Sequence, residues 1–332
     1  MTEQRQEETC FVRSDCSSLA GMKRFSHEAM ATTFEILIVH EDDRYALQAA
    51  IAAFNEVDRL EGEFSRFIEN SDVSRINNLA AGEPLLLGLD TFECLKISAR
   101  VNAETAGAFD VTIGSVFQCW RNEDAAPRTP LAQELDLARQ RTGMHLLELD
   151  ETRLTVKLLV SQVQIDLGGV GKGYAVDRAA ELLREWSIET ALISGGYSSV
   201  LALDVPPGTK GWPLTLSHPA DRSQILARPH LRAGALSGSG VQKGRHIISP
   251  RTAEPTEGKL AAWSGAPDAA SADALSTAFM IMTADEIEKY CALHPDTRAM
   301  VIVQEQGQDT QKDKILRFGP WKDISDFKSD TL

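Results

Sequence analysis

The stretch VQIDLGGVGKGYAVDRAAELL (163–183) constrains the fold most, because it joins a strand pattern, a glycine-rich turn and a helix pattern. Its glycines are Gly168, Gly169, Gly171 and Gly173. An amphipathic helix is predicted from about Gly171 to Trp186. Glycines let a backbone approach a ligand closely, and a helix N-terminus offers amides and a partial positive charge to phosphate. The stretch therefore predicts a phosphate-binding turn, to which Lys172 adds a charge; the alternative is a strand-to-helix turn without a ligand.

Familiar catalytic motifs do not fit the chain. Asp166 stands where a Walker A loop has its first glycine, and Gly173 stands where it has Ser or Thr. Tyr174 stands where a Rossmann fingerprint has its third glycine. HEAMA (27–31) lacks the second histidine of a zinc-protease helix, and no G-x-S-x-G elbow occurs. These classes of enzyme are disfavoured.

Charge and composition narrow the function classes further. The net charge of -14 argues against a general nucleic-acid binder, which needs a basic face. No apolar run approaches the roughly 18 residues that span a bilayer, so no membrane insertion is expected. MTEQRQEETC (1–10) does not look like a secretory signal. The five cysteines are odd in number and scattered, which favours reduced thiols and a cytoplasmic location. They are Cys10, Cys16, Cys94, Cys119 and Cys291.

Strand and helix patterns follow one another without strict alternation, which predicts an α+β fold of mixed α/β type. A single unit is expected over 23–328, after a flexible tail over 1–22. Strands are expected over 30–41, within 145–167 with a turn near Asp150–Thr152, in short pieces over 190–265, and over 298–305. Helices are expected over 42–67, in a short segment capped by Ser71 or Asp72, from about Asp90, over 171–186, around Asp273, and over 284–293.

A second glycine-rich and polar stretch, AGALSGSGVQKGRHIISPRTAEP (233–255), contains His246. A lone histidine is more often structural than catalytic, but the glycines and the neighbouring Arg245 and Arg251 favour a site here. Further glycine-bordered turns lie in 105–120 and 191–203. These turns contribute Asp110, Thr112, Gly195 and Gly196.

ASADALSTA (270–278) places Asp273 and Thr277 four residues apart, on one face of a helix. One interpretation is helix-start chemistry, in which Ser271 or Asp273 caps the helix and Thr277 bonds to a carbonyl one turn earlier. The other is a pair of oxygen ligands for a hard cation such as magnesium. The segment alone favours the first interpretation and leaves both open.

Six motifs together, in one order, resemble the FAD:protein FMN transferases, the ApbE flavin transferase family. The motifs are MATTFEI (30–36), FSRFIENSDVSRIN (64–77), TAGAFDVTIGSVFQCW (105–120), IDLGGVGKGYAVDRAAELL (165–183), GALSGSG with RHIISPRT (234–240 and 245–252), and ADALSTA (272–278). The resemblance implies a fold related to T-fold architecture, FAD as substrate and Mg²⁺ as cofactor. It implies transfer of the FMN moiety to a Thr or Ser hydroxyl of a target protein, with release of AMP.

The resemblance also implies roles for residues of this chain. Asp273, Thr277 and the Gly171 carbonyl match the metal ligands, which reverses the preference left by the segment alone. His246 and Lys172 match catalytic positions, with His246 as the base, and an ordinary histidine pKa near 6.5 suits that role. The residues implied to bind FAD are Met30, Asp110, Gly169, Gly171, Lys172, Gly173, Gly195, Gly196, Ser239, Gly240 and His246. The Gly171 and Gly173 amides are expected to hold phosphate oxygens.

The chain departs from the family pattern at five positions. Ser249 and Ala253 replace the Asp and the final Gly of H-I-I-D-P-R-T-G, Ala31 replaces a Gly, Tyr197 replaces an acidic residue, and Gly171 replaces the Ala before the lysine. Loss of the carboxylate at Ser249 removes a group that would orient His246. Three hypotheses remain open: a working flavin transferase, a metal-dependent FAD pyrophosphatase that yields FMN and AMP, and a non-catalytic FAD-binding protein.

Overall fold

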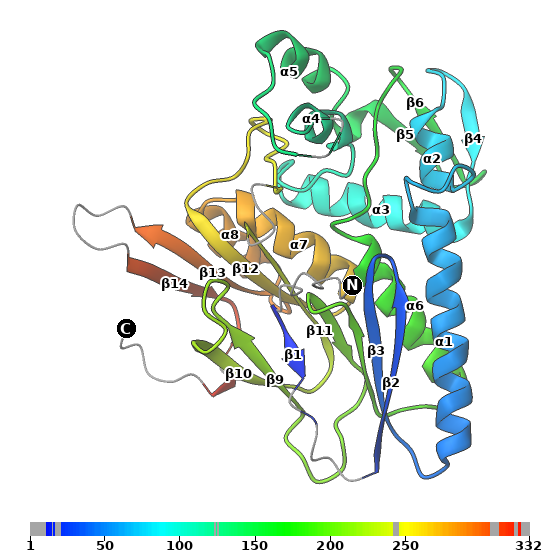
Figure 1. Cartoon of the computed structure of the whole chain (residues 1–332), viewed down its shortest axis with the longest axis vertical. Coiled ribbons are helices and arrows are strands. Elements are labelled where there is room, and N and C mark those ends of the chain that lie inside the picture. The colour runs from blue at the N-terminus through cyan, green and yellow to red at the C-terminus, as the bar shows by residue number, and fades with distance from the viewer. Residues whose placement is uncertain are drawn as a thin grey trace, which may run out of the picture.

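A computed structural model of the chain describes residues 11–14, 16, 21–122, 124, 126–241, 246–305, 312–321 and 325–326 (Figure 1). Cys10 and Arg245, which the sequence interpretation used, lie outside these residues. The strands are β1 (Arg13–Ser14), β2 (Met22–Ala29), β3 (Thr32–Val39), β4 (Pro84–Leu86), β5 (Leu147–Asp150), β6 (Thr155–Leu158), β7 (Ala191–Gly195), β8 (Ser199–Ala202), β9 (Trp212–Ser217), β10 (Ile225–Leu231), β11 (Gly234–Gly240), β12 (Lys259–Ala266), β13 (Arg298–Glu305), β14 (Lys312–Phe318) and β15 (Ser325–Asp326). The helices are α1 (Asp43–Phe64), α2 (Asp72–Asn77), α3 (Leu89–Glu104), α4 (Gly114–Cys119), α5 (Ala132–Arg139), α6 (Gly171–Glu185), α7 (Ala269–Ile281) and α8 (Ala284–Leu293), with a 3-10 turn at Met144–Leu146.

One large antiparallel sheet forms the centre of the molecule, in the order β14-β13-β12-β11-β8-β7-β3-β2. Alternate side chains of a strand face opposite sides of a sheet. In β3, Phe34, Ile36 and Ile38 accordingly join one hydrophobic cluster, whereas Leu37 joins another. Both faces of the sheet are therefore covered. The described helices and strands confirm the predicted mixed α+β class.

Helices cover one face of the sheet, and a second small sheet covers the other. The helix α7 packs against β11 and β12, α6 packs against β7 and β8, and α1 packs on α6 (Figure 1). On the other face, β1, β9, β10 and β15 form a four-stranded sheet around the second cluster. No helix among the described residues is both long and apolar enough to cross a membrane.

Several boundaries match the sequence patterns. Ser71 caps α2 by accepting a hydrogen bond from the Ser74 amide, as one of the two predicted caps. The helix 284–293 and the strand 298–305 have their predicted limits. Other elements were not predicted: β1, β2, β4, α4, α5, β14 and β15 were missed. The N-cap of α7 is Asp268, which accepts from the Ser271 amide, and not Ser271 or Asp273.

The segment predicted as a flexible tail is partly built into the fold. Within 1–22 the structure describes residues 11–14, 16, 21 and 22. Of these, Arg13 and Ser14 pair with Thr215 and Leu214 of β9. Phe11 and Val12 are buried. The described part of the predicted tail therefore contains a short strand, and the side chains of Phe11 and Val12 before it are buried in the protein.

Candidate active site

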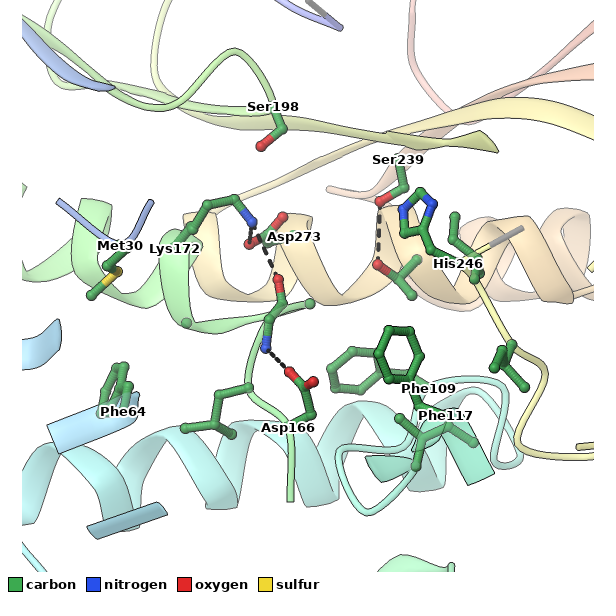
Figure 2. A pocket seen from close by; sticks show the side chains of 18 of the residues that line it. Met30, Phe64, Phe109, Phe117, Asp166, Lys172, Ser198, Ser239, His246 and Asp273 are labelled. Atoms are coloured by element: carbon green, nitrogen blue, oxygen red, sulfur yellow. Dashed lines mark hydrogen bonds and ion pairs between the residues drawn. The ribbon is translucent and has the colours of Figure 1, made fainter. Parts of the chain in front are cut away.

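A cavity of about 580 Å³ lies where the start of α6, the middle of α7 and the end of β11 meet. Ten of the predicted site residues line it. They are Met30, Asp110, Gly169, Gly171, Lys172, Ser239, Gly240, His246, Asp273 and Thr277. The three sequence segments that carry the strongest motifs are thus brought to one cavity (Figure 2).

The Asp273 carboxylate is the most buried charge of the cavity, with an exposed fraction of 2%. Its Oδ2 accepts a hydrogen bond from the Gly173 amide at 3.2 Å and lies 3.5 Å from Lys172 Nζ. Lys172 Nζ also donates to the Gly168 carbonyl at 3.2 Å (Figure 2). The ammonium therefore lies between a carboxylate and a carbonyl oxygen, at a point that suits a cation.

Hydroxyl groups continue this polar wall along α7. Ser239 Oγ lies 3.2 Å from Thr277 Oγ1 and 2.7 Å from Ser276 Oγ. The Ser276 hydroxyl also donates a hydrogen bond to the Asp273 backbone carbonyl within α7. Thr277 therefore contacts the end of β11 directly, one helical turn from Asp273.

The oxygen donors of this wall fit a magnesium ion. Magnesium is commonly held by one or two carboxylates together with substrate phosphates. Asp273 supplies a buried carboxylate, Thr277 supplies a hydroxyl on the same helix face, and the Gly168 carbonyl faces the same ammonium as Asp273. No group of three or more His, Cys, Asp or Glu side chains suited to a metal occurs among the described residues. The wall accordingly suits a cation that shares its coordination with phosphate.

The glycine-rich turn does not offer the amides that the sequence predicted for phosphate. The Gly171 amide donates to the Leu167 carbonyl at 2.7 Å, and the Gly173 amide is taken by Asp273. Gly173 does not line the cavity; a Cβ there would lie 2.2 Å from the Ala269 carbonyl oxygen. Its role is the close packing of α6 on α7. Both amides thus already have acceptors in this structure, the first within the local turn and the second on α7.

Gly195 and Gly196 also lie outside the cavity lining. A Cβ on Gly195 would lie 2.9 Å from the Val176 side chain, and Gly196 has a φ of +63° in the turn between β7 and β8. Both glycines serve packing and turn geometry. The next two residues, Tyr197 and Ser198, line the cavity instead.

Asp110 lines the cavity, but its carboxylate is used to hold loops together. Oδ1 accepts from the Thr112 amide and hydroxyl, and Oδ2 accepts from the Met144 amide at 3.1 Å. Burial raises the pKa of Asp110 above its ordinary value, against these lowering hydrogen bonds. Asp110 therefore shapes the wall between 105–112 and 143–144.

His246 lines the cavity on the side of Ser239 and Phe109 (Figure 2). Ser249, which replaces the family's Asp, is buried and accepts a hydrogen bond from the Thr252 amide at 3.3 Å. Arg251 donates to the Thr105 carbonyl and pairs with Glu286 at 2.8 Å, and it does not line the cavity. The basic setting proposed for His246 thus does not include Arg251.

Sequence reasoning missed several lining residues. Asp166 accepts from the Gly168 amide at 2.8 Å and pairs with Arg66 at 3.1 Å. Phenylalanine side chains contribute to the remaining wall, and they are Phe11, Phe64, Phe67, Phe109 and Phe117. Most of these lie inside the quoted motifs, so the motifs located them without indicating their role. For Phe11 no signal in the sequence was available.

Comparisons with known proteins agree with this geometry. The model of the ApbE family matches residues 30–301. A FAD:protein FMN transferase of Klebsiella pneumoniae (strain 342) is 27% identical over 297 residues, which cover 84% of this chain and 81% of that protein. One of Chlamydia muridarum is 29% identical over 246 residues, covering 70% and 74%. The solved structure of the flavin transferase ApbE from Vibrio cholerae has a TM-score of 0.80 at 22% identity, covering 91% of this chain and 99% of that one. The ApbE protein of Thermotoga maritima has a TM-score of 0.77 at 25% identity, covering 88% and 96%.

Proposed function

The chain belongs to the ApbE family, and we propose that it is a magnesium-dependent transferase that moves the FMN moiety of FAD to a Thr or Ser hydroxyl of a target protein. In this reaction the hydroxyl oxygen bonds to the FMN phosphorus. The phosphoanhydride bond breaks, and AMP leaves with its electron pair. The relatives named FAD:protein FMN transferase support FAD as the substrate and a protein as the acceptor.

One observation carries this proposal. A single cavity brings together the Asp273 and Thr277 face of α7, the start of α6 and His246. Phosphoryl transfer depends mostly on positioning and on charge neutralisation. A protein with a net charge of -14 needs a local cation to hold a pyrophosphate, and this cavity holds the matching oxygen donors.

Asp273, Thr277 and a backbone carbonyl of the glycine-rich turn would hold the magnesium ion. The candidates for that carbonyl are Gly171, from the family resemblance, and Gly168, which faces Lys172 Nζ. When bound, magnesium neutralises phosphate charge and stabilises the leaving AMP. Lys172, freed from Asp273, places its ammonium against a phosphate oxygen. His246 accepts the proton of the attacking hydroxyl.

The experiment is FMN transfer to a library of peptides that each carry one Thr or Ser, followed by mass spectrometry, with AMP measured by chromatography. We expect His246→Ala to lower the rate by about 10²- to 10⁴-fold, the range for loss of a general base. His230→Ala is the matched control, because His230 lies on β10 and does not line the cavity. An undiminished rate in His246→Ala would show that the base is another group. Free FMN released beside an intact acceptor would indicate a pyrophosphatase instead.

A further inference from the structure

The N-terminal segment Phe11–Ser14 is bound to both the four-stranded sheet and the central sheet, although it precedes the family match, which begins at residue 30. The amides of Phe11 and Val12 donate to the Tyr197 carbonyl at 2.9 and 3.0 Å. Trp263 Nε1 donates to the Phe11 carbonyl at 3.0 Å. With the pairing of β1 to β9, the segment is held by backbone bonds at both ends.

Phe11 lies where this segment meets the cavity. It lines the cavity together with Tyr197, Ser198 and Gly238. Its ring meets the Trp263 ring edge to face, with centroids 6.2 Å apart and planes at 72°. A Cβ on Gly238 would lie 2.7 Å from the Phe11 Cβ, so a side chain there would displace Phe11. The ring is thus positioned by a tryptophan and by a glycine that leaves space for it.

FAD carries one planar ring system at each end of its pyrophosphate, and aromatic residues occur in two parts of the cavity lining. Ser198 lies on one side of the Lys172–Asp273 pair, and Phe109 and Phe117 lie on the other (Figure 2). Phe11 is hydrogen-bonded to Tyr197, the neighbour of Ser198. Aromatic walls therefore flank the place where the proposed function puts the pyrophosphate.

We propose that Phe11 contacts one of the two ring systems of FAD, and that the segment Phe11–Ser14 is a built-in wall of the substrate site. This inference rests on the proposed function only for the identity of the ligand. Aromatic rings attract other planar rings through stacked and edge-to-face contacts. The contact makes Phe11 a binding residue that this chain supplies from outside the span of the family match.

The test compares Phe11→Ala and Phe11→Leu with Val12→Ala in the full chain. Val12 is buried in the same hydrophobic cluster as Phe11 but does not line the cavity, so it reports the structural cost alone. Dissociation constants for FAD, FMN and ADP are measured by calorimetry, with magnesium present and the acceptor peptides left out to prevent transfer. We expect Phe11→Ala to weaken FAD binding about three- to tenfold and Phe11→Leu about twofold, with Val12→Ala unchanged. Weakened binding of ADP assigns the contact to the adenine ring, and weakened binding of FMN assigns it to the isoalloxazine ring.

Equal FAD affinity in Phe11→Ala and Val12→Ala would overturn the proposal. Circular dichroism checks that each variant is folded; if Phe11→Ala is not, unchanged affinity in Phe11→Leu overturns it. The proposed transferase function can be refuted independently of the role of Phe11. Wild-type protein that binds FAD but transfers no FMN would refute the transferase and leave the Phe11 comparison valid, whereas wild-type protein that does not bind FAD would overturn both.

Discussion

At the scale of single residues, two neighbours in the cavity wall have an unfavourable backbone. Met30 and Ala31 form the turn between β2 and β3 with φ of 50° and 57°. Such left-handed conformations cost L-residues about 1–2 kcal/mol, and glycine avoids most of that cost. The resemblance predicted glycine where this chain has Ala31, and the positive φ gives a physical reason to prefer glycine there. Ala253, the other departure from glycine, has a φ of 60° but is buried, so glycine there would also lose contacts.

We predict that Ala31→Gly stabilises the protein by about 0.5–1 kcal/mol, the relief of strain less the extra chain entropy of glycine. Urea unfolding measures the change. Ala52→Gly, in the middle of α1, is the control and should destabilise by about 1 kcal/mol. If Ala31→Gly is less stable than wild type, the packing of the Ala31 methyl group contributes more free energy than the backbone strain costs.

The residue scale also shows which site residues a sequence can predict. Asp273 and Thr277 were predictable because four-residue spacing fixes their shared helix face whatever surrounds the helix. The amides of Gly171 and Gly173 were not, because their hydrogen-bond acceptors are set by local turn geometry and by another helix. A free donor can be identified only once its tertiary partners are known.

At the scale of elements, α6 holds the beginning of α7 and thereby places Asp273. Asp177 of α6 accepts from the Ala269 and Ala270 amides at 2.7 and 2.8 Å. Gly173, one turn earlier, lets the two helices touch at their backbones. These contacts satisfy two of the amides that a helix N-terminus leaves unpaired.

We predict that Gly173→Ala destabilises the protein by about 1–3 kcal/mol, because its Cβ would overlap the Ala269 carbonyl and force the helices apart. The matched control is Gly62→Ala in α1, where a Cβ meets nothing within 4 Å. That change should stabilise by about 0.5–1 kcal/mol through helix propensity. Thermal unfolding measures the melting temperatures of both variants. Similar shifts of the two melting temperatures in the same direction would contradict the close approach of α6 and α7 at Gly173.

Asp177 should also make stability depend on pH. The pKa of Asp177 is raised from 3.8 to about 7: burial is the main cause, Asp268 and Glu181 add to it, and the two amide hydrogen bonds oppose it. Between pH 4 and 7 the Asp177 carboxyl is therefore protonated more often in the folded protein than in the unfolded chain. Its contribution to the free energy of unfolding falls as pH rises through that window. We expect the melting temperature of wild type to fall relative to Asp177→Asn from pH 4 to 7, and the difference to level off above pH 7. A constant difference across that range would refute the assignment.

At the scale of the whole molecule, the first and last described strands, β1 and β15, are the edges of the four-stranded sheet, and the central sheet has edges of its own. The edge strands are β2, near the N-terminus, and β14, near the C-terminus. The mixed fold class was predictable from local periodicity, and so were most long helices. The strand order and the role of Phe11–Ser14 were not, because pairing between distant strands leaves no local pattern.

The proposed transfer requires magnesium held by Asp273 for cleavage of FAD in this cavity. The most direct measurement follows FAD, FMN and AMP by chromatography, with magnesium or EDTA, for wild type and Asp273→Asn. Asp285→Asn is the control, because Asp285 is exposed on α8 and outside the cavity. With the acceptor peptides present, we expect magnesium-dependent formation of AMP in wild type and Asp285→Asn, and its loss in Asp273→Asn. AMP formation that persists in Asp273→Asn, or that EDTA leaves unchanged, would contradict the account.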